Sequence, residues 1–308
     1  FSIKLMHKKI LLTGVNGQVG QALKNQLLQY EVIALSRNQL DLTSIQNIRH
    51  VVREVKPDLI INPAAYTAVD KAESEPELAY AINGTAPQIL AEEAARLGAA
   101  LIHFSTDYVY DGTKESVYIE TDIVNPLSVY GKSKLMGEDG IRSVGLPHLI
   151  LRTSWVYGIY GSNFLKTILR LATDQDCLRL VDDQFGAPTS AECIAEAMVN
   201  LLKVWEPKQN QSGIFHFTNT GGSDLSGYVS WYGFSQQIFN EYNLLASVRN
   251  WPTLKASKIE AITTSQYPSI ATRPINSMLS NAKLKDTFNI ELPTWQQGLK
   301  QVMHKLTF

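Results

Sequence analysis

The chain has 308 residues, of which 44% are hydrophobic and 19% are charged, enough apolar material for one large α/β unit or for a large and a small one together. The formal charge is −1, and the lack of a concentrated basic cluster argues against a nucleic-acid partner. No apolar run reaches the roughly 18 residues of a membrane span, so we expect a water-soluble protein with no membrane partner.

The N-terminal half alternates short apolar runs with amphipathic stretches. We interpret residues 1–5 as a leader or as residues added by engineering, because the first strand follows so soon. The pattern predicts strands at 9–13, 32–35, 57–62, 99–105 and 148–153, and helices at 18–30, 45–55, 76–97 and 127–144. Strands that alternate with helices of this length indicate βαβ units. The expected fold class is therefore α/β, with a Rossmann-like, doubly wound parallel sheet.

The rhythm loosens after residue 153. Helices are expected at 163–173, 191–204 and near 230–242, and a strand at 213–219. The stretch 221–280 is rich in Gly, Ser, Tyr and Pro, which is typical of a smaller lobe. We therefore expect a dinucleotide-binding domain at 6–155, to which 189–219 returns, and a C-terminal substrate-binding lobe at 156–188 and 220–308.

A glycine-rich turn separates the first strand from its helix. Gly14, Gly17 and Gly20 give the spacing GxxGxxG, with Gln18 and Val19 opening the helix. Glycines let the backbone turn tightly and approach a pyrophosphate, while the free N–H groups of a helix N-terminus favour its charge. Directly after the first strand of a βαβ series, this turn predicts a dinucleotide site.

The end of the second strand bears on the choice of cofactor. A carboxylate there would bind the ribose 2′-hydroxyl of NAD, whereas a nearby arginine accommodates the 2′-phosphate of NADP. Arg37 stands at this position with no acidic neighbour, so we expect NADPH and leave NADH open. Asp41 and Leu42 follow a few residues later and are expected to lie beside the adenine.

Tyr130 and Lys134 form a YxxxK pair on a predicted helix. Four residues apart, the two side chains share one helix face. A free tyrosine has a pKa near 10, and a nearby ammonium group stabilises the phenolate, so that the phenol can serve as a proton donor at neutral pH. The pair predicts acid–base catalysis next to a bound nicotinamide.

Two further segments end strands at the same edge of the sheet, where open α/β sheets bind ligands. Thr106, Asp107 and Tyr108 follow the fourth strand, and the Thr106 hydroxyl can hydrogen-bond a carbonyl that is being reduced. Residues 64–66 (Ala-Ala-Tyr: Ala64, Ala65 and Tyr66) follow the third strand and are expected to line the cofactor site. The convergence of these segments predicts an oxidoreductase.

Taken together, these motifs resemble the extended short-chain dehydrogenase/reductases, and among them the dTDP-4-dehydrorhamnose reductases. The resemblance covers nearly the whole chain from Lys9. Its segments are GxxGQxG at 14–20, AAYTAVDKAE at 64–73, STDYV at 105–109, YGKSK at 130–134, RTSWVY at 152–157, NF at 163–164, DQFGAPT at 183–189 and RP at 273–274.

The resemblance implies a catalytic set of Thr106, Tyr130 and Lys134, with hydride transfer to C4 of a dTDP-linked keto sugar and proton donation by Tyr130. It also implies that Trp155 and Asn163 line the sugar site. Arg273 would bind the nucleotide diphosphate, whose geometry suits a guanidinium group.

Some relatives form dimers around a magnesium ion held by glutamates. Glu192 is present, but the glutamines and glycine at 296–298 and the Gln-Ala pair after the glycine turn are not magnesium ligands of this kind. The scattered histidines suggest no other metal site, and for each of the six we expect a surface or core role. We therefore do not favour magnesium and leave a homodimer open. The stretch 220–232 is longer than expected for the family.

Three alternatives remain at this point. A 4,6-dehydratase would need an acidic residue after Asp107, where Tyr108 stands, and an epimerase would favour a carboxylate where Arg37 stands. A non-catalytic regulatory subunit, like the accessory subunit of methionine adenosyltransferase, would not need the intact catalytic set. The only cysteines, Cys177 and Cys193, show no disulfide pattern and favour a cytoplasmic location.

Overall fold

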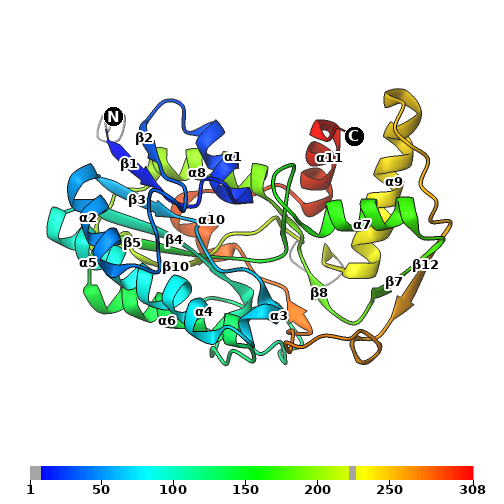
Figure 1. Ribbon diagram of the computed structural model, residues 1–308, viewed down its shortest axis with the longest axis horizontal. Coiled ribbons are helices and arrows are strands. Elements are labelled where there is room, and N and C mark those ends of the chain that lie inside the picture. The colour runs from blue at the N-terminus through cyan, green and yellow to red at the C-terminus, as the bar shows by residue number, and fades with distance from the viewer. Residues whose placement is uncertain (1–7, 222–226, 308) are drawn as a thin grey trace.

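The computed structural model describes residues 8–221 and 227–307. The expectation for residues 1–5 and the middle of the 220–232 stretch lie outside these ranges. The centre is a six-stranded, fully parallel sheet (Figure 1). In spatial order its strands are β10 (Gly213–His216), β5 (His148–Thr153), β4 (Ala100–Thr106), β3 (Leu59–Asn62), β1 (Lys9–Leu12) and β2 (Glu31–Ala34).

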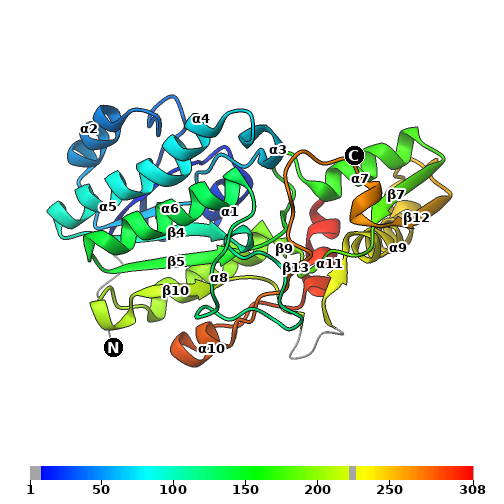
Figure 2. The ribbon, with the colours of Figure 1, turned by 90° about the horizontal axis from the view of Figure 1, so that it is seen from below.

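Helices cover both faces of this sheet, which explains why its strands are apolar on both sides. Ile10 and Leu12 of β1 pack toward one helix layer, whereas Leu11 between them packs toward the other. Viewed from below (Figure 2), α2, α5 and α6 form one layer and α10 lies on the opposite side of the strands. Helix α8 packs in the same apolar cluster as Ile10 and Leu12 and so belongs to the layer opposite α2 and α5. The helices are α1 (Gln18–Gln26), α2 (Ile45–Val55), α5 (Ala86–Leu97), α6 (Val129–Val144), α8 (Ala191–Val204) and α10 (Ala282–Phe288).

The expected long helix at 76–97 is interrupted. It consists of α4 (Pro76–Tyr80), a π-helical turn at Ala81–Thr85 and α5, and a short helix, α3 (Val69–Ala72), precedes it. The wide turn contains the buried Asn83, whose amide accepts from Tyr66 N (2.8 Å) and donates to Tyr66 O (3.0 Å). Asn83 thereby fixes the loop after β3, and π-turns inside helices are frequent at functional sites.

The C-terminal part adds a lobe beside the carboxyl ends of the strands, on the right in Figure 1. Its helices are α7 (Phe164–Asp174), α9 (Trp231–Arg249) and α11 (Trp295–Lys305), which share an apolar cluster. Its strands pair as β7 (Cys177–Val181) with β12 (Lys258–Ile262), β6 (Val156–Tyr157) with β9 (Thr189–Ser190), and β8 (Phe185–Gly186) with β11 (Val229–Ser230) and β13 (Asn276–Ser277).

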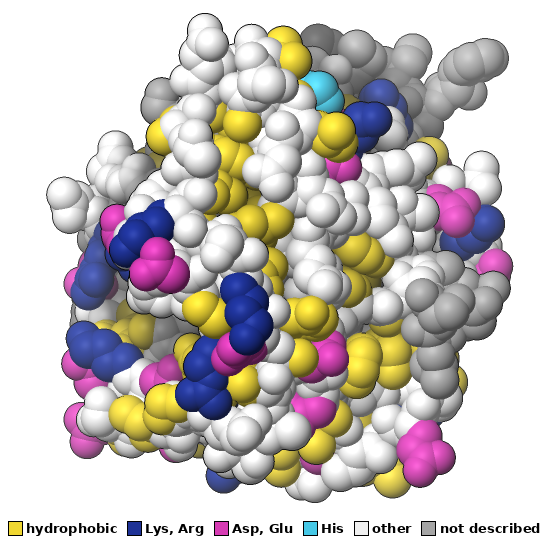
Figure 3. Space-filling model, turned by 90° about the vertical axis from the view of Figure 1, so that its right-hand side faces the viewer, with side chains coloured by type: hydrophobic (Ala, Val, Ile, Leu, Met, Phe, Trp, Pro, Cys, Tyr) yellow, Lys and Arg dark blue, Asp and Glu magenta, His cyan; other side chains and the backbone are white. Residues whose placement is uncertain are grey.

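The outer face of the lobe mixes charges of both signs. Dark-blue Lys and Arg side chains lie beside magenta Asp and Glu side chains in Figure 3. Exposed ion pairs there join Lys255 to Asp176 (3.3 Å) and Arg170 to Asp174 (3.9 Å). Among the described residues, no helix is long and apolar enough to span a membrane.

Several expected boundaries were wrong. The first helix ends at Gln26 instead of residue 30, and α9 continues to Arg249 instead of ending near 242. The strand expected at 213–219 ends at His216, after which Phe217 N still bonds to Arg152 O (2.8 Å). The division into domains at the expected boundaries stays a prediction, although β10 does return to the central sheet.

Candidate active site

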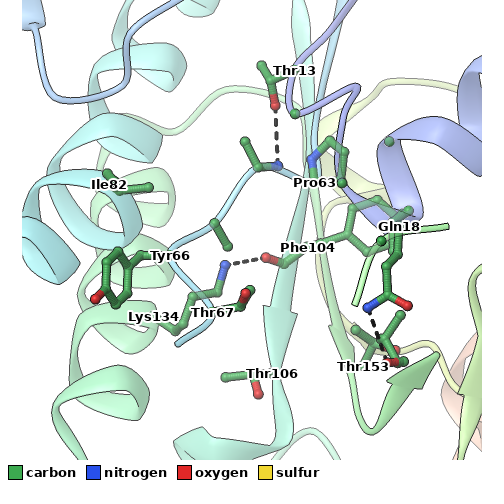
Figure 4. Close-up of a pocket in the computed structure, with 18 of the residues that line it drawn as sticks. Thr13, Gln18, Pro63, Tyr66, Thr67, Ile82, Phe104, Thr106, Lys134 and Thr153 are labelled. Atoms are coloured by element: carbon green, nitrogen blue, oxygen red, sulfur yellow. Dashed lines mark hydrogen bonds between the residues drawn. The ribbon is translucent and has the colours of Figure 1, made fainter. Parts of the chain in front are cut away.

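A cavity of about 760 Å³ opens at the carboxyl ends of the parallel strands. The chain leaves β1 toward β2 on one side and then continues through β3, β4, β5 and β10 on the other, so the strand order reverses beside β1. Ligands of open α/β sheets bind at such a reversal. The cavity receives residues from the loops after β1, β2, β3, β4 and β5 and from α6 (Figure 4).

The glycine turn forms one wall of this cavity, and two of its glycines are required by close contacts. Gly14 has a φ of +59°, and a Cβ there would lie 2.8 Å from Ala64 Cα. A Cβ on Gly20 would lie 2.1 Å from Gly14 O, where the turn meets α1. Gly17, Gln18 and Val19 also line the cavity, so this part of the predicted site is brought together.

The end of β2 contributes Arg37, Asp41 and Leu42 to the same cavity. Arg37 is exposed, and Leu42 is buried. Asp41 accepts from the hydroxyl (2.7 Å) and the N–H (2.9 Å) of Thr43. These bonds, together with the charge of Arg37, lower the pKa of Asp41. Asp41 therefore stays ionised in the neutral pH range.

The loop after β3 places Ala64, Ala65 and Tyr66 along the cavity. The Tyr66 hydroxyl donates to Glu75 Oε2 (2.7 Å), and Figure 4 shows the ring directed away from Lys134. The Tyr66 hydroxyl is therefore already bonded to Glu75, although Tyr66 lines the cavity.

Tyr130 and Lys134 lie on the first turns of α6, whose N-terminus is capped by Ser128. Both line the cavity, and the Lys134 ammonium donates to Phe104 O (2.5 Å), as Figure 4 shows. Burial raises the pKa of Tyr130 to about 12, against a smaller effect of its hydrogen bond with Thr106. Burial lowers the pKa of Lys134 to about 8, against the opposing charge of Glu138.

Thr106, the last residue of β4, reaches the cavity together with the two residues that follow it. Its hydroxyl donates to Asp107 Oδ1 (3.0 Å), and Ser277 donates to the other oxygen of that carboxylate (2.5 Å). Burial raises the pKa of Asp107 to about 6. The ring of Tyr108 packs edge-on against Tyr130, with centroids 5.4 Å apart.

Trp155 and Asn163 also line the cavity, opposite α6. Trp155 has a φ of +50°, which is rare for a bulky residue, and its ring stacks on Trp231 with centroids 3.5 Å apart. Asn163 caps α7 by accepting from Lys166 N (3.1 Å) and donates to Gln18 Oε1 (3.0 Å). The polar atoms of Asn163 are therefore already bonded within the chain.

Arg273 does not belong to the residues that line the cavity. It pairs with the Asp70 carboxylate at 2.6 Å, across the gap between the C-terminal lobe and α3. Its charge nevertheless acts to lower the pKa of Tyr108, which does line the cavity. Its predicted contact with a diphosphate stays a prediction.

Glu192, the acidic residue considered for a shared magnesium, is buried on α8. Its Oε1 accepts from Ile159 N (3.1 Å). Within the ranges that the structure describes, no three His, Cys, Asp or Glu side chains gather as metal ligands.

The sequence did not single out His103, which lies in the middle of β4 and is fully buried. Its Nε2 is 3.3 Å from Lys134 Nζ, and its Nδ1 is 3.0 Å from Asn62 Nδ2. The available signal was a polar residue inside a strand that is buried on both faces. Such a residue requires hydrogen-bonding partners.

This fold and cavity define an extended short-chain dehydrogenase/reductase architecture. The solved UDP-glucose 4-epimerase of Thermus thermophilus, in complex with NAD, superposes with a TM-score of 0.75 at 20% identity, covering 96% of this chain and 98% of that one. At that identity the likeness concerns the fold alone.

The chain belongs to the RmlD substrate binding domain family, whose model matches residues 8–308. It is 43% identical to the dTDP-4-dehydrorhamnose reductase of Burkholderia thailandensis, covering 94% of this chain and 96% of that protein. The solved dTDP-4-dehydrorhamnose reductase of Bacillus anthracis, in complex with NADP, has a TM-score of 0.87 and 32% identity, covering 98% of this chain and 100% of that one.

Proposed function

We propose that this protein uses NADPH to reduce the C4 ketone of dTDP-4-dehydrorhamnose, which gives dTDP-L-rhamnose. The observation that carries the proposal is the single cavity that collects the glycine turn, Thr106, Tyr130 and Lys134. Family membership supports the same reaction. We do not propose a purely regulatory role, because every member of the expected catalytic set faces this cavity.

The residues around the glycine turn fit a dinucleotide. The lack of a side chain on Gly20 lets the glycine turn pack directly against α1. The N-cap residue Gly17 makes no side-chain cap, which leaves the first N–H groups of α1 open to a phosphate. Arg37 would bind the 2′-phosphate, Asp41 and Leu42 would flank the adenine, and Lys134 would bind the ribose hydroxyls. The bound nicotinamide would supply the hydride that adds to C4.

The chain's own residues supply the proton. Thr106 turns its hydroxyl proton from Asp107 to the ketone oxygen and holds that oxygen by a hydrogen bond. Tyr130 transfers its phenolic proton to the same oxygen as it becomes an alkoxide. Lys134 stabilises the phenolate that remains on Tyr130. Because the pKa of Tyr130 is raised to about 12, this side chain carries its proton throughout the neutral range. It therefore enters each turnover as an acid.

The sugar nucleotide would lie between α6 and the C-terminal lobe. Trp155 offers a flat apolar surface that Trp231 holds in place. Asn163 borders the same space, and Arg273, which is outside the cavity lining, would bind the diphosphate. A homodimer and a cytoplasmic location also stay predictions.

The proposed reaction is tested by adding dTDP-4-dehydrorhamnose, made in situ by the preceding enzymes of its synthesis, to the protein and NADPH. We expect loss of the nicotinamide absorbance together with formation of dTDP-L-rhamnose, identified by chromatography. A control without the keto sugar should show no loss. Unchanged absorbance with verified substrate would refute the proposal.

The role of Arg37 predicts a change in cofactor preference. Replacement by alanine removes a charge-assisted contact with the 2′-phosphate, worth about 1.5–3 kcal/mol, so kcat/KM for NADPH should fall about 10- to 100-fold. The value for NADH, which lacks this phosphate, should change little. Arg142→Ala, at an exposed arginine near the end of α6, is the matched control. Equal losses with both cofactors would contradict the assignment.

A further inference from the structure

A buried chain of hydrogen bonds runs behind the cavity from the end of β1 to Lys134. Thr13 Oγ1 donates to Asn62 Oδ1 (2.6 Å), Asn62 Nδ2 faces His103 Nδ1 (3.0 Å), and His103 Nε2 faces Lys134 Nζ (3.3 Å). All four side chains are at most 1% exposed. Thr13 and Lys134 border the cavity, whereas Asn62 and His103 between them do not. The polar atoms of Asn62 and His103 must therefore be satisfied within the protein, and each bond must have one donor and one acceptor.

The direction of these bonds is read from the Thr13 hydroxyl, which donates to Asn62 Oδ1 in the structure. Ala64 N–H, which can only donate, bonds to Thr13 Oγ1 (3.3 Å), so the Thr13 hydroxyl is free to donate its own proton to Asn62. The Asn62 carbonyl oxygen accepts that proton, and its NH₂ group must then point at His103. An NH₂ group only donates, so Nδ1 of His103 is the acceptor.

This direction fixes the tautomer of His103. A neutral imidazole whose Nδ1 accepts carries its proton on Nε2. Burial, with the charge of Lys134 as a second cause, lowers the pKa of His103 well below its ordinary value, so the ring is neutral. The Nε2–H group then faces Nζ of Lys134. An ammonium group has only donors and cannot accept from it, whereas a neutral amine can.

We propose that His103, oriented by Asn62 and Thr13, is a positioning residue that sets the protonation state of Lys134 and thereby the upper pH limit of the activity. This inference rests on the proposed function, in which Lys134 acts as a cation. His103 does not line the cavity and so acts through Lys134. Thr13 is separated from His103 by two hydrogen bonds, through Asn62, and acts on the Lys134 amine through them.

Other charged groups surround α6 and must be held constant in any test. On α6 itself these are Tyr130, Lys132, Glu138, Asp139 and Arg142. On the elements packed against it, or paired with it, they are Asp70, Lys71, Glu73, Glu77, Tyr80, Glu92, Glu93, Arg96, His103, Asp107, Tyr108 and Arg152. Glu138 raises the pKa of Lys134, and Glu138 is itself paired with Arg152. A substitution at Thr13 leaves every one of them in place.

The first test reads the tautomer directly and needs no activity. Protein labelled with ¹⁵N-histidine is studied by NMR without substrate, and the His103 signal is assigned by its loss in His103→Phe. We expect a neutral ring with the proton on Nε2 from pH 6 to 9. A proton on Nδ1, or a charged ring, would overturn the inference. Because no turnover is measured, this result stands apart from the success or failure of the proposed function.

The second test compares Thr13→Val with Thr13→Ser. Valine matches threonine in shape but lacks the hydroxyl, so the Asn62 amide can turn and present its oxygen to His103. The ring then carries its proton on Nδ1, and Nε2 accepts from the Lys134 ammonium. The charged form is favoured, and the pH at which kcat/KM declines should move up from about 8.

If the pH at which kcat/KM declines moves up by one unit, the fraction of the maximal kcat/KM that remains at pH 9 should rise about fivefold. Thr13→Ser keeps the hydroxyl, so its kcat/KM should decline at the same pH as that of the wild type. If His103 of Thr13→Val carries its proton on Nδ1 and the pH at which kcat/KM declines has not moved, the link to Lys134 is overturned. If His103 keeps its proton on Nε2 in this variant, the orienting role of Thr13 is overturned. NADPH oxidation absent from the wild type would instead refute the proposed function.

Discussion

Replacement of Tyr130 by phenylalanine is expected to lower kcat by about 10²–10⁴ and to leave the Kd for NADPH nearly unchanged. Phenylalanine keeps the ring and its edge-on contact with Tyr108 but removes the only atom that would give a proton to the alkoxide. General acid catalysis by a positioned side chain accounts for a loss of this size. The measurement is stopped-flow or steady-state NADPH oxidation, with Kd from quenching of cofactor fluorescence.

The Tyr130→Phe substitution should affect turnover and leave cofactor binding unchanged, because different residues serve the two functions. The glycine turn and Arg37 would bind the cofactor, and neither contacts the Tyr130 hydroxyl in the described hydrogen bonds. The loss should therefore fall on kcat and kcat/KM together, which marks an interaction made in the transition state alone. A rise in KM with unchanged kcat would instead assign the hydroxyl to substrate binding.

Tyr232→Phe is the matched control, because its hydroxyl makes an exposed bond to Gln236 on α9, away from the cavity. Its removal should leave kcat within about twofold of the wild type, as expected for a surface change. Turnover of Tyr130→Phe equal to that of the control would contradict the proton-donor role.

The parallel sheet and the cofactor end of the site could be predicted from the sequence because their signals are local. A strand, a glycine turn and a helix within about a dozen residues specify the dinucleotide wall, and the steric needs of Gly14 and Gly20 explain the glycines. The YxxxK spacing predicts a shared face of α6, and Tyr130 and Lys134 both reach the cavity.

The rest depends on contacts between distant parts of the chain. Arg273 looks like a free phosphate ligand in the sequence, but Asp70, some 200 residues earlier, pairs with it. β7 pairs with β12 about 80 residues further along the chain, beyond α8, β10 and α9. His103 resembles any core histidine until Asn62 and Lys134 are placed on either side of it. The hydrophobic periodicity of the sequence does not predict such long-range pairings.

A second buried polar network predicts the largest effect on stability. The guanidinium of Arg152 donates to both oxygens of Glu138 (2.9 and 2.6 Å) and to the Tyr110 hydroxyl (2.7 Å), and Ser105 donates to the same carboxylate (2.5 Å). Arg152 is 2% exposed and Glu138 is fully buried. The network ties α6 to β4 and β5 directly behind the cavity.

Replacement of Arg152 by methionine, which keeps much of the volume, should lower the free energy of unfolding by about 3–5 kcal/mol at pH 8. The reason is the uncompensated carboxylate of Glu138, which loses its cation but stays out of water. The measurement is urea denaturation followed by circular dichroism. Arg142→Met, which breaks an exposed pair with Asp139, is the control and should cost about 0–1 kcal/mol.

Two further measurements separate this cause from a simple loss of packing. In the Arg152→Met protein the buried carboxyl group takes up a proton on folding, so stability should fall as the pH rises and the loss should be smaller at pH 5 than at pH 8. The double variant Arg152→Met with Glu138→Leu removes both charges of this network and should regain most of the lost stability. A loss that is independent of pH and unrelieved by the second substitution would show that Arg152 acts through its packing and not through its charge.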